Sequence, residues 1–417
     1  MKFVIRGGAT LSGSIGVSGS KNAVLPILAA TLLTRETCIL DNVPRITDVE
    51  SMMSLLKNAG CDIRWTGEHQ VTTCAGDASS YQVDRHLIRS FRASILLLGP
   101  FLSRFGTITI PEPGGCLIGN RPLDAHFEGL EQLGAAVKKT NEGYRLTRRA
   151  LKAGTVVLRE ASVTATENIL MLASGIDGTT RIKNAAYEPH VQDLALFLTR
   201  LGVSIEGIGT STLTVQGVRE YTGARHSVIP DTIEAGTFLI MGLATGSPLT
   251  ITGCAPDHLD VVLATLASMG AQFDIGKTSI RIKRPTRLKN FKIDTRPYPG
   301  IPTDLQSLFG ILATQCEGTS LIHDTLFEGR MGYIQELVTM GAKATVCDPH
   351  RVLVSGPTEL AGHTIKSLDL RAGISLLIAG LIAQGTTVIN DAQLIDRGYE
   401  RIEERLKKIG ADIIREQ

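Results

Sequence analysis

A cysteine and an arginine stand five residues apart in the segment PEPGGCLIGNRP, residues 111–122. Its three prolines and three glycines exclude a helix or a regular strand, so we expect an exposed loop. A guanidinium near a thiol favours the thiolate and lowers the thiol pKa. Cys116, close to Arg121, is therefore a candidate nucleophile or proton donor, although an exposed thiol without catalytic function would fit the same residues.

Other polar residues recur at two equivalent positions along the chain. One position opens a segment that is apolar nearly all round, and its members are Ser20, Lys21, Asn22, Arg92, Ser162, Thr164, Asp231, Glu234, Thr303, Asp304, Asp369 and Arg371. The other position is a loop after a predicted strand, and its members are Cys116, Arg121, Glu188, His190, Asp257, His258, Glu328, Arg330, Asp396 and Arg397.

The charges at these positions predict a site for a small ligand that carries several negative charges. Helix N-termini present N–H groups and partial positive charge, and the arginine fork matches carboxylate and phosphate oxygens. If the apolar helices run parallel, one face gathers Lys21, Arg92, Arg121, Arg330, Arg371 and Arg397. Taken one at a time, these residues are explained as well by ordinary helix caps and solvated arginines.

A repeat of roughly 70 residues must position these side chains. The pattern Leu-x-x-x-Gly recurs and ends at Gly60, Gly134, Gly202, Gly270, Gly341 and Gly410. Each glycine follows an amphipathic segment, where a helix C-cap requires a left-handed residue, and alternating strand-like residues come next. An apolar segment and a β-rich segment precede each amphipathic one. The chain is therefore expected to be an α/β protein with six copies of a helix-strand-helix-strand unit.

The six copies divide into two groups of three. They predict a first domain over residues 22–229, which includes the cysteine loop, and a second domain built from residues 1–21 and 230–417. The last copy ends one strand after Gly410, and residues 2–17 offer the missing strand. Two chain crossings between the domains suggest a hinge and a cleft. The copy with Cys116 is the longest, which is typical of a functional loop.

Composition excludes several classes of protein. The 417 residues are 43% hydrophobic and 20% charged, as in globular proteins, and a net charge of +2 gives no reason to expect nucleic acid. Seven scattered cysteines without a CxxC pair predict neither a disulfide framework nor a metal site, and they favour a reducing cytoplasm. The N-terminus lacks the features of a signal peptide, and the apolar run 24–33 is too short to insert into a membrane.

Nine segments resemble the UDP-N-acetylglucosamine 1-carboxyvinyltransferases, a branch of the enolpyruvyl transferase family. They are SGSKNAVLPIL, RASILLLGP, PGGCLIGNRPLDAH, ASVTATENI, NAAYEPH, PDTIEAGTFL, PTDLQSLF, DLRAGISLL and DRGYERIEERL. The resemblance covers the whole chain with almost no gaps. It implies a two-domain inverted α/β barrel with three repeats per domain. It also implies transfer of the enolpyruvyl group of phosphoenolpyruvate to the 3-hydroxyl of UDP-N-acetylglucosamine, with release of phosphate and without metal or cofactor. This reaction is the first committed step of peptidoglycan synthesis, in the cytoplasm.

The resemblance also implies roles for particular residues. Cys116 matches the proton donor to the methylene carbon, which forms a covalent adduct with phosphoenolpyruvate and reacts with the inhibitor fosfomycin. Asp304 matches the base that takes the proton of the sugar hydroxyl. The residues that match the phosphoenolpyruvate site are Lys21, Asn22, Arg121, Arg330, Arg371 and Arg397, and of these Lys21 and Arg397 are also expected to be catalytic. Family members with aspartate in place of the cysteine resist fosfomycin, so this chain is expected to be sensitive.

The residues that match the UDP-sugar site are Arg92, Arg121, Pro122, Leu123, Asp124, Ala125, Glu160, Ala161, Ser162, Val163, Asp304 and Leu326. Some residues depart from the family pattern. Thr164 stands where glycine is usual, and Glu160 and Thr232 replace residues that are commonly basic. Most of the departures touch the nucleotide side, so their effect on the choice of acceptor stays open.

Three alternatives remain at this point. The acceptor could be shikimate 3-phosphate, although the cysteine loop argues against it, or a nucleotide such as UMP. The chain could also be a catalytically silent sensor of UDP-sugars. The presence of Lys21, Cys116, Asp304 and Arg397 argues against a sensor, since a sensor needs no proton donor.

Overall fold

The computed structural model describes residues 1–78, 87–88, 91–111, 118–119, 121–283 and 287–417. The described residues form two compact units. Those of Met1–Ser18, Leu117–Asn120 and Pro230–Gln417 form the C-terminal unit, and those of Gly19–Cys116 and Arg121–Ile229 form the central unit. Each unit has its own hydrophobic core.

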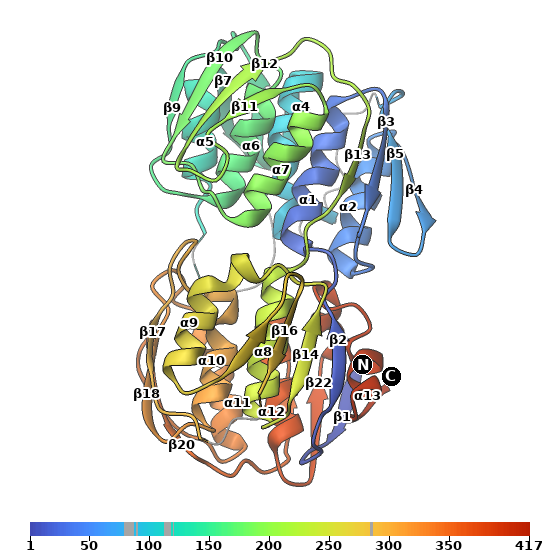
Figure 1. Cartoon of the computed structure of the whole chain (residues 1–417). Coiled ribbons are helices and arrows are strands. Elements are labelled where there is room, and N and C mark those ends of the chain that lie inside the picture. The colour runs from blue at the N-terminus through green and yellow to red at the C-terminus, as the bar shows by residue number, and fades with distance from the viewer. Residues whose placement is uncertain (79–86, 89–90, 112–117, 120, 284–286) are drawn as a thin grey trace. The chain divides into compact units, whose positions relative to one another are not determined.

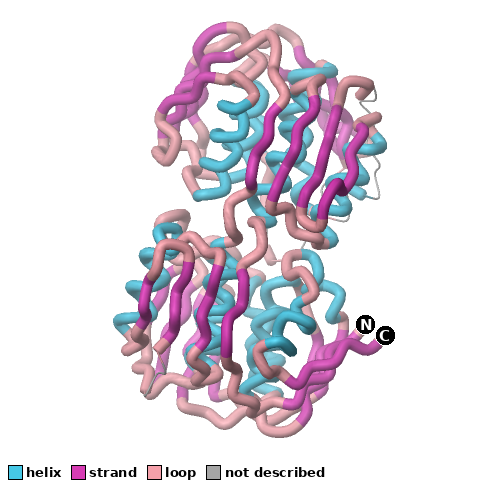
Figure 2. The backbone as a smooth tube through the Cα atoms, turned by 45° about the vertical axis from the view of Figure 1, so that its right-hand side comes forward, coloured by secondary structure: helices cyan, strands magenta, loops and turns pink. Residues whose placement is uncertain are grey.

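Three sheets form the outer layer of the central unit among its described residues (Figures 1 and 2). In sheet order, the first consists of β13 (Ala224–Ser227), β3 (Thr37–Asp41), β5 (Gln70–Cys74) and β4 (Asp62–Gly67). The second consists of β11 (Ser204–Glu206), β12 (Thr212–Gly217), β10 (Gly178–Lys183) and β9 (Thr155–Val157). The third consists of β6 (Thr107–Ile110), β8 (Gly143–Arg148) and β7 (Ala135–Thr140).

The described part of the C-terminal unit also has three sheets. The first consists of β15 (Phe273–Ile275), β16 (Ser279–Ile282), β14 (Leu249–Thr252) and β2 (Gly13–Gly16). The second consists of β17 (Lys292–Asp294), β18 (Gly318–His323), β20 (Arg351–Gly356) and β19 (Lys343–Asp348). The third consists of β21 (Thr364–Lys366), β22 (Thr386–Asn390), β1 (Lys2–Arg6) and β23 (Asp412–Glu416). The N-terminal strand β1 is antiparallel to both β22 and β23 and so lies inside this sheet.

Apolar helices fill the interior of each unit. They are α1 (Lys21–Ala30), α4 (Leu98–Phe105) after the 3-10 turn η2 (Arg92–Leu97), and α6 (Val163–Ala173) in the central unit. Their counterparts in the C-terminal unit are α8 (Thr232–Ala244), α10 (Gln306–Ala313) after η4 (Thr303–Leu305), and α12 (Leu370–Ile382). Burial of these segments, which were predicted from their uniform apolarity, is confirmed, and the α/β fold class is confirmed with it.

Amphipathic helices lie between the interior and the solvent. They are α2 (Thr47–Asn58), α5 (Asp124–Gln132), α7 (Pro189–Arg200), α9 (Asp260–Ser268), α11 (Tyr333–Thr339) and α13 (Ile402–Lys408). The glycine that follows each of them has φ between 96° and 105°, in the left-handed region. The predicted C-caps are therefore confirmed. No helix within the described ranges is both long and apolar enough to cross a bilayer.

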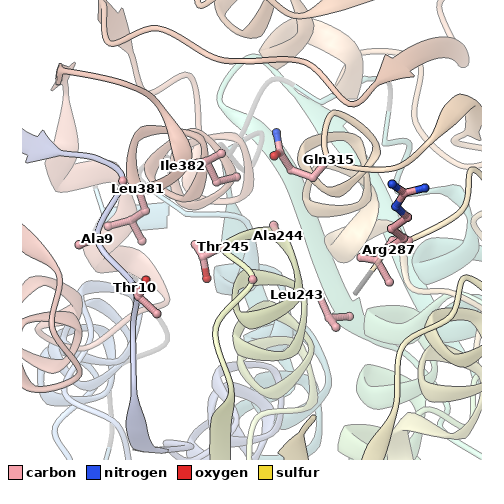
Figure 3. Close-up of a pocket in the computed structure, with 12 residues that line it drawn as sticks. Ala9, Thr10, Leu243, Ala244, Thr245, Arg287, Gln315, Leu381 and Ile382 are labelled. Carbon is pink, nitrogen blue, oxygen red and sulfur yellow. The ribbon is translucent and has the colours of Figure 1, made fainter. Parts of the chain in front are cut away.

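The interior helices of the C-terminal unit run parallel. The N-terminal segments of α10 and α12 lie side by side, and the hydroxyls of Ser307 and Ser375 are hydrogen-bonded at 2.7 Å. At the other end, residues after α10 and at the ends of α8 and α12 surround a cavity of about 340 Å³, lined by Thr10, Thr245, Arg287, Gln315 and Leu381 among others (Figure 3). None of the predicted site residues lines this cavity. Of the predicted site residues, Asp304 and Arg371 lie instead at the N-terminal ends of α10 and α12.

Candidate functional site

Asp304 forms the centre of a charged cluster at the N-terminal ends of α10 and α12. One carboxylate oxygen accepts a hydrogen bond from Arg330 Nη2 at 2.8 Å. The other accepts two from Arg371, from Nη2 at 2.7 Å and from Nε at 3.0 Å. The side chain of Asp304 keeps 21% of its surface exposed, whereas those of Arg330 and Arg371 keep 11% and 10%. The cluster is thus partly buried, with the carboxylate as its most accessible member.

Each arginine in this cluster is held by the protein as well. Arg330, in η5 (Arg330–Gly332), also donates to the carbonyl of Thr303 at 2.9 Å. Burial alone would lower the pKa of Arg371, but the charge of Asp304 raises it above the ordinary arginine value. The Arg371 guanidinium therefore remains charged, as a site for an anion requires.

Helix caps account for several of the polar residues at the helix starts. Ser20 accepts from the N–H of Ala23, Asp231 from those of Ile233 and Glu234, and Asp369 from those of Arg371 and Ala372. The alternative that these residues are ordinary caps is therefore correct for all three. Ser162 is different, because its side chain makes no capping bond to α6.

Asp324 fixes the loop that contains Leu326. This fully buried carboxylate accepts from the N–H groups of Leu326 and Phe327 at 3.0 and 3.1 Å. It also accepts from the hydroxyls of Thr295 and Thr303. Leu326 itself remains 41% exposed. The aspartate therefore connects a predicted UDP-sugar residue to η4, the turn that carries Asp304.

Lys21 opens α1 in the central unit and pairs with Asp48 of α2. Their Nζ and Oδ2 atoms lie 3.3 Å apart, with side-chain exposures of 15% and 4%. The lysine is therefore oriented by a buried carboxylate while part of its surface stays accessible. Asn22, the next residue, is half-buried.

Most predicted UDP-sugar residues lie near the N-terminal ends of α5 and α6. Arg92 Nη2 donates to the carbonyl of Arg121, directly before the segment Pro122, Leu123, Asp124 and Ala125. Burial, and then the charge of Arg121, lower the pKa of Arg92 to about 10, so it stays charged at neutral pH. At α6, the N–H of Ser162 donates to the carbonyl of Glu160 at 2.8 Å, which bends the chain through Ala161 toward Val163.

Thr164, which departs from the family pattern, contacts a buried histidine. Its hydroxyl lies 2.8 Å from Nε2 of His126, the residue after Ala125. Burial, and then the charge of Arg92, lower the pKa of His126 to about 3. A neutral imidazole therefore connects the first turn of α5 to that of α6. Of the other two departures from the family pattern, Glu160 is exposed and Thr232 is half-buried.

The predicted cysteine loop is only partly described. Cys116 and Asn120 lie outside the described residues. Ile118 and Gly119 are described, and the carbonyl of Ile118 accepts from the N–H of Gly329 at 2.9 Å. Gly119 has φ +133°, a conformation that other residues rarely adopt, and a Cβ there would require the Glu328 carboxylate, 2.3 Å away, to move. This short segment is therefore anchored next to Arg330, within the C-terminal unit.

The other cysteines are poor candidates for thiol chemistry. Cys38, Cys61, Cys254 and Cys316 are buried, and burial raises the pKa of Cys38 to about 11 and of Cys61 and Cys316 to about 12. Among the cysteines that the structure describes, only Cys347 is exposed. No group of three or more His, Cys, Asp and Glu side chains in the described ranges is arranged to hold a metal ion.

Four buried residues were given no role from the sequence. Asp324 was not singled out, and His126 and Tyr399 were quoted in motifs without a role, although the hydroxyl of Tyr399 accepts a hydrogen bond from Arg371. Glu167 also escaped notice: it is 1% exposed, and burial and the charge of Glu188 raise its pKa well above the ordinary value. A carboxylate within the apolar segment TATENILMLAS was the available signal.

Comparison with known proteins identifies enolpyruvyl transferases as similar to this chain. The family model described as EPSP synthase (3-phosphoshikimate 1-carboxyvinyltransferase) matches residues 5–406. A relative from Koribacter versatilis named UDP-N-acetylglucosamine 1-carboxyvinyltransferase is 43% identical over 417 residues, covering 99% of this chain and 96% of the relative. A relative of the same name from Bradyrhizobium diazoefficiens is 43% identical over 425 residues, covering 100% and 98%.

Solved structures share the fold. The enolpyruvyl transferase NikO from Streptomyces tendae is similar with a TM-score of 0.89 and 26% identity, covering 99% of this chain and 98% of that one. EPSP synthase from Acinetobacter baumannii has a TM-score of 0.75 and 19% identity, covering 99% and 100%, which shows likeness of fold alone.

Acid should destabilise the central unit through His126. Its folded-state pKa of about 3 lies below the roughly 6.5 of an unfolded histidine, so the unfolded chain binds more protons between these values. This contribution to stability is complete above pH 6.5 and is lost as pH falls, by at most about 1.4 kcal/mol per pH unit. The free energy of unfolding at each pH is measured by urea unfolding, followed by the fluorescence of Trp65 in β4 of the same unit.

The control is His126→Gln, because an amide can still reach the hydroxyl of Thr164 and does not titrate in this range. The free energy of unfolding should fall more steeply with acid in the original chain than in the variant. If the free energies of unfolding of the two proteins fell in parallel between pH 7 and pH 4.5, a neutral, buried His126 would be contradicted.

Proposed function

The chain belongs to the enolpyruvyl transferase family, and we propose that it transfers the enolpyruvyl group of phosphoenolpyruvate to the 3-hydroxyl of UDP-N-acetylglucosamine, releasing phosphate. The observation that carries the proposal is 43% identity, over 99% of this chain, to a relative named for that acceptor. The reaction is the first committed step of peptidoglycan synthesis and takes place in the cytoplasm.

The anion site for phosphoenolpyruvate consists of Lys21, Asn22, Arg121, Arg330, Arg371 and Arg397. The phosphate and the carboxylate of phosphoenolpyruvate both require cationic partners. The charged state of Arg371 supports this assignment. As phosphate leaves in the second half of the reaction, fixed guanidiniums stabilise the charge that develops on its oxygens. Lys21, oriented by Asp48, supplies a further positive charge.

Asp304 is the base for the acceptor in this proposal. The 3-hydroxyl oxygen attacks C2 of phosphoenolpyruvate while its proton passes to Asp304, and Cys116 gives a proton to the methylene carbon C3. The product of this addition is a tetrahedral intermediate. Loss of a proton from the new methyl group and of phosphate from C2 then restores the double bond. The partial exposure of the Asp304 carboxylate supports its role, because a base must reach its substrate.

The UDP-sugar contacts the residues that match the family's UDP-sugar site in this proposal. Arg92, Arg121 and the segments 122–125 and 160–163 contact the nucleotide side, and Asp304 and Leu326 contact the sugar side. The bend at Glu160–Ser162 leaves the start of α6 without a side-chain cap, which suits a phosphate oxygen. Thr164, whose hydroxyl lies 2.8 Å from Nε2 of His126, stands in the first turn of the same helix.

The acceptor should be UDP-N-acetylglucosamine. Purified protein with phosphoenolpyruvate is expected to release phosphate with this acceptor, and at least about 100-fold more slowly with shikimate 3-phosphate or UMP, since the site's polar groups would be left unpaired. Colorimetric measurement of released phosphate and mass analysis of the product check this choice of acceptor. Release with either alternative acceptor but not with the UDP-sugar would overturn the proposal, and no release with any acceptor would favour a sensor.

Cys116 should be the residue that fosfomycin modifies. Cys116→Ser is expected to lose enolpyruvyl transfer by at least about 100-fold, as for a lost general acid, and to lose the fosfomycin adduct with it. Peptide mass mapping after incubation with fosfomycin locates the adduct.

The matched control is Cys347→Ser, which removes an exposed cysteine on β19 and should change neither property. An adduct that persists in Cys116→Ser, or that maps to Cys347, would show that the proposed thiol is not the reactive one.

A further inference from the structure

Tyr399 lies behind the Asp304 cluster and has no exposed surface. It follows η6 (Ala392–Arg397), the turn that ends in Arg397, and its backbone N–H donates to the carbonyl of Ile395 at 3.1 Å. Its hydroxyl oxygen is 3.3 Å from Nη1 of Arg371 and 2.7 Å from the hydroxyl of Thr237 on α8. The phenol therefore connects the arginine of one repeat to the interior helix of another.

The directions of these hydrogen bonds can be deduced. The hydroxyl of Thr237 donates its single proton to the carbonyl of Ile233 at 2.8 Å, since a carbonyl only accepts. The hydroxyl of Tyr399 must then donate to Thr237, and this leaves its oxygen lone pairs toward Arg371. A guanidinium has donors only, so Arg371 donates to Tyr399. The chain thus runs from Arg371 through Tyr399 and Thr237 to the backbone of α8.

The protonation state of Tyr399 agrees with these directions. Burial raises the pKa of its phenol to about 12, against the opposing effect of the Arg371 charge. The phenol therefore keeps the proton that it donates to Thr237. The hydrogen bonds of the Arg371 guanidinium are divided between two partners, with Nε and Nη2 donating to Asp304 and Nη1 donating to Tyr399.

We propose that Tyr399, supported by Thr237, is a positioning residue that fixes the Arg371 guanidinium in the plane in which it binds Asp304. Because two N–H groups of Arg371 bond the same carboxylate oxygen, rotation of the guanidinium would change the orientation of the base. Tyr399 blocks this rotation from the opposite edge. The kinetic consequence rests on the proposed function of Asp304, whereas the structural consequence does not.

The test replaces the phenol hydroxyl without changing the ring. Tyr399→Phe is expected to lower kcat about tenfold, as for the loss of a hydrogen bond to a charged group, with less than a twofold change in KM for the UDP-sugar. Thr237→Val should lower kcat about threefold, whereas Thr237→Ser, which keeps the hydroxyl, should restore it. In the double variant with Tyr399→Phe and Thr237→Val, kcat should equal that of Tyr399→Phe alone, because Thr237 acts only through the phenol.

Tyr333→Phe provides a matched control. Tyr333 is an equally buried tyrosine of the same unit, but its hydroxyl accepts from Gln306 rather than from Arg371. This variant should keep kcat within twofold, so a general loss of buried hydroxyls is distinguished from a loss of positioning.

A spectroscopic readout is independent of catalysis. In ¹⁵N-labelled protein, the Nε–H signal of Arg371, assigned by its loss in Arg371→Lys, should be slow to exchange with water and should broaden or shift in Tyr399→Phe. An unchanged signal in Tyr399→Phe would overturn the positioning role, whatever the activity. If the original chain releases no phosphate, the proposed function fails, and this signal still decides the role of Tyr399.

Discussion

The partly buried ion cluster of Asp304, Arg330 and Arg371 is the interaction on which the site depends. Burying charged groups costs free energy unless each is paired, and removal of one partner from such a cluster typically costs about 3–5 kcal/mol. Here one carboxylate faces two guanidiniums, so cationic side chains outnumber anionic ones within the cluster itself. In our proposal a bound anion offsets this excess. Phosphoenolpyruvate, with a carboxylate and a phosphate, suits that excess of charge.

The repeat architecture explains how the cluster is assembled. Parallel interior helices bring their N-terminal ends together, and each carries one member of the network: Asp304 precedes α10, Arg371 opens α12, and Thr237 lies in the second turn of α8. The caps Asp231 and Asp369 satisfy the backbone N–H groups at two of these ends. In our proposal the positive charge that meets a ligand therefore comes mainly from arginine side chains. This modifies the expectation that the helix N-termini themselves form the anion site.

The sequence predicted the periodic features of the fold because they depend on local rules. A left-handed residue after an amphipathic helix must be glycine or nearly so, and the uniformly apolar segments had to be buried. The charged residues were also found individually, from their equivalent places in the repeats. Their pairing could not be predicted, since Arg371 and Asp304 are 67 residues apart and Tyr399 and Thr237 are 162 apart. Buried polar residues such as Asp324 and His126 gave no local signal that distinguished them from ordinary loop and helix residues.

The central claim is that Asp304, oriented by Arg330 and Arg371, receives the proton of the acceptor hydroxyl. A crystal structure with UDP-N-acetylglucosamine bound measures the relevant distance most directly. We expect a carboxylate oxygen of Asp304 about 2.6–3.2 Å from the 3-hydroxyl oxygen of the sugar, with Arg371 still bonded to Asp304. An acceptor hydroxyl more than about 5 Å from this carboxylate, with neither direct nor single-water contact, would contradict the account.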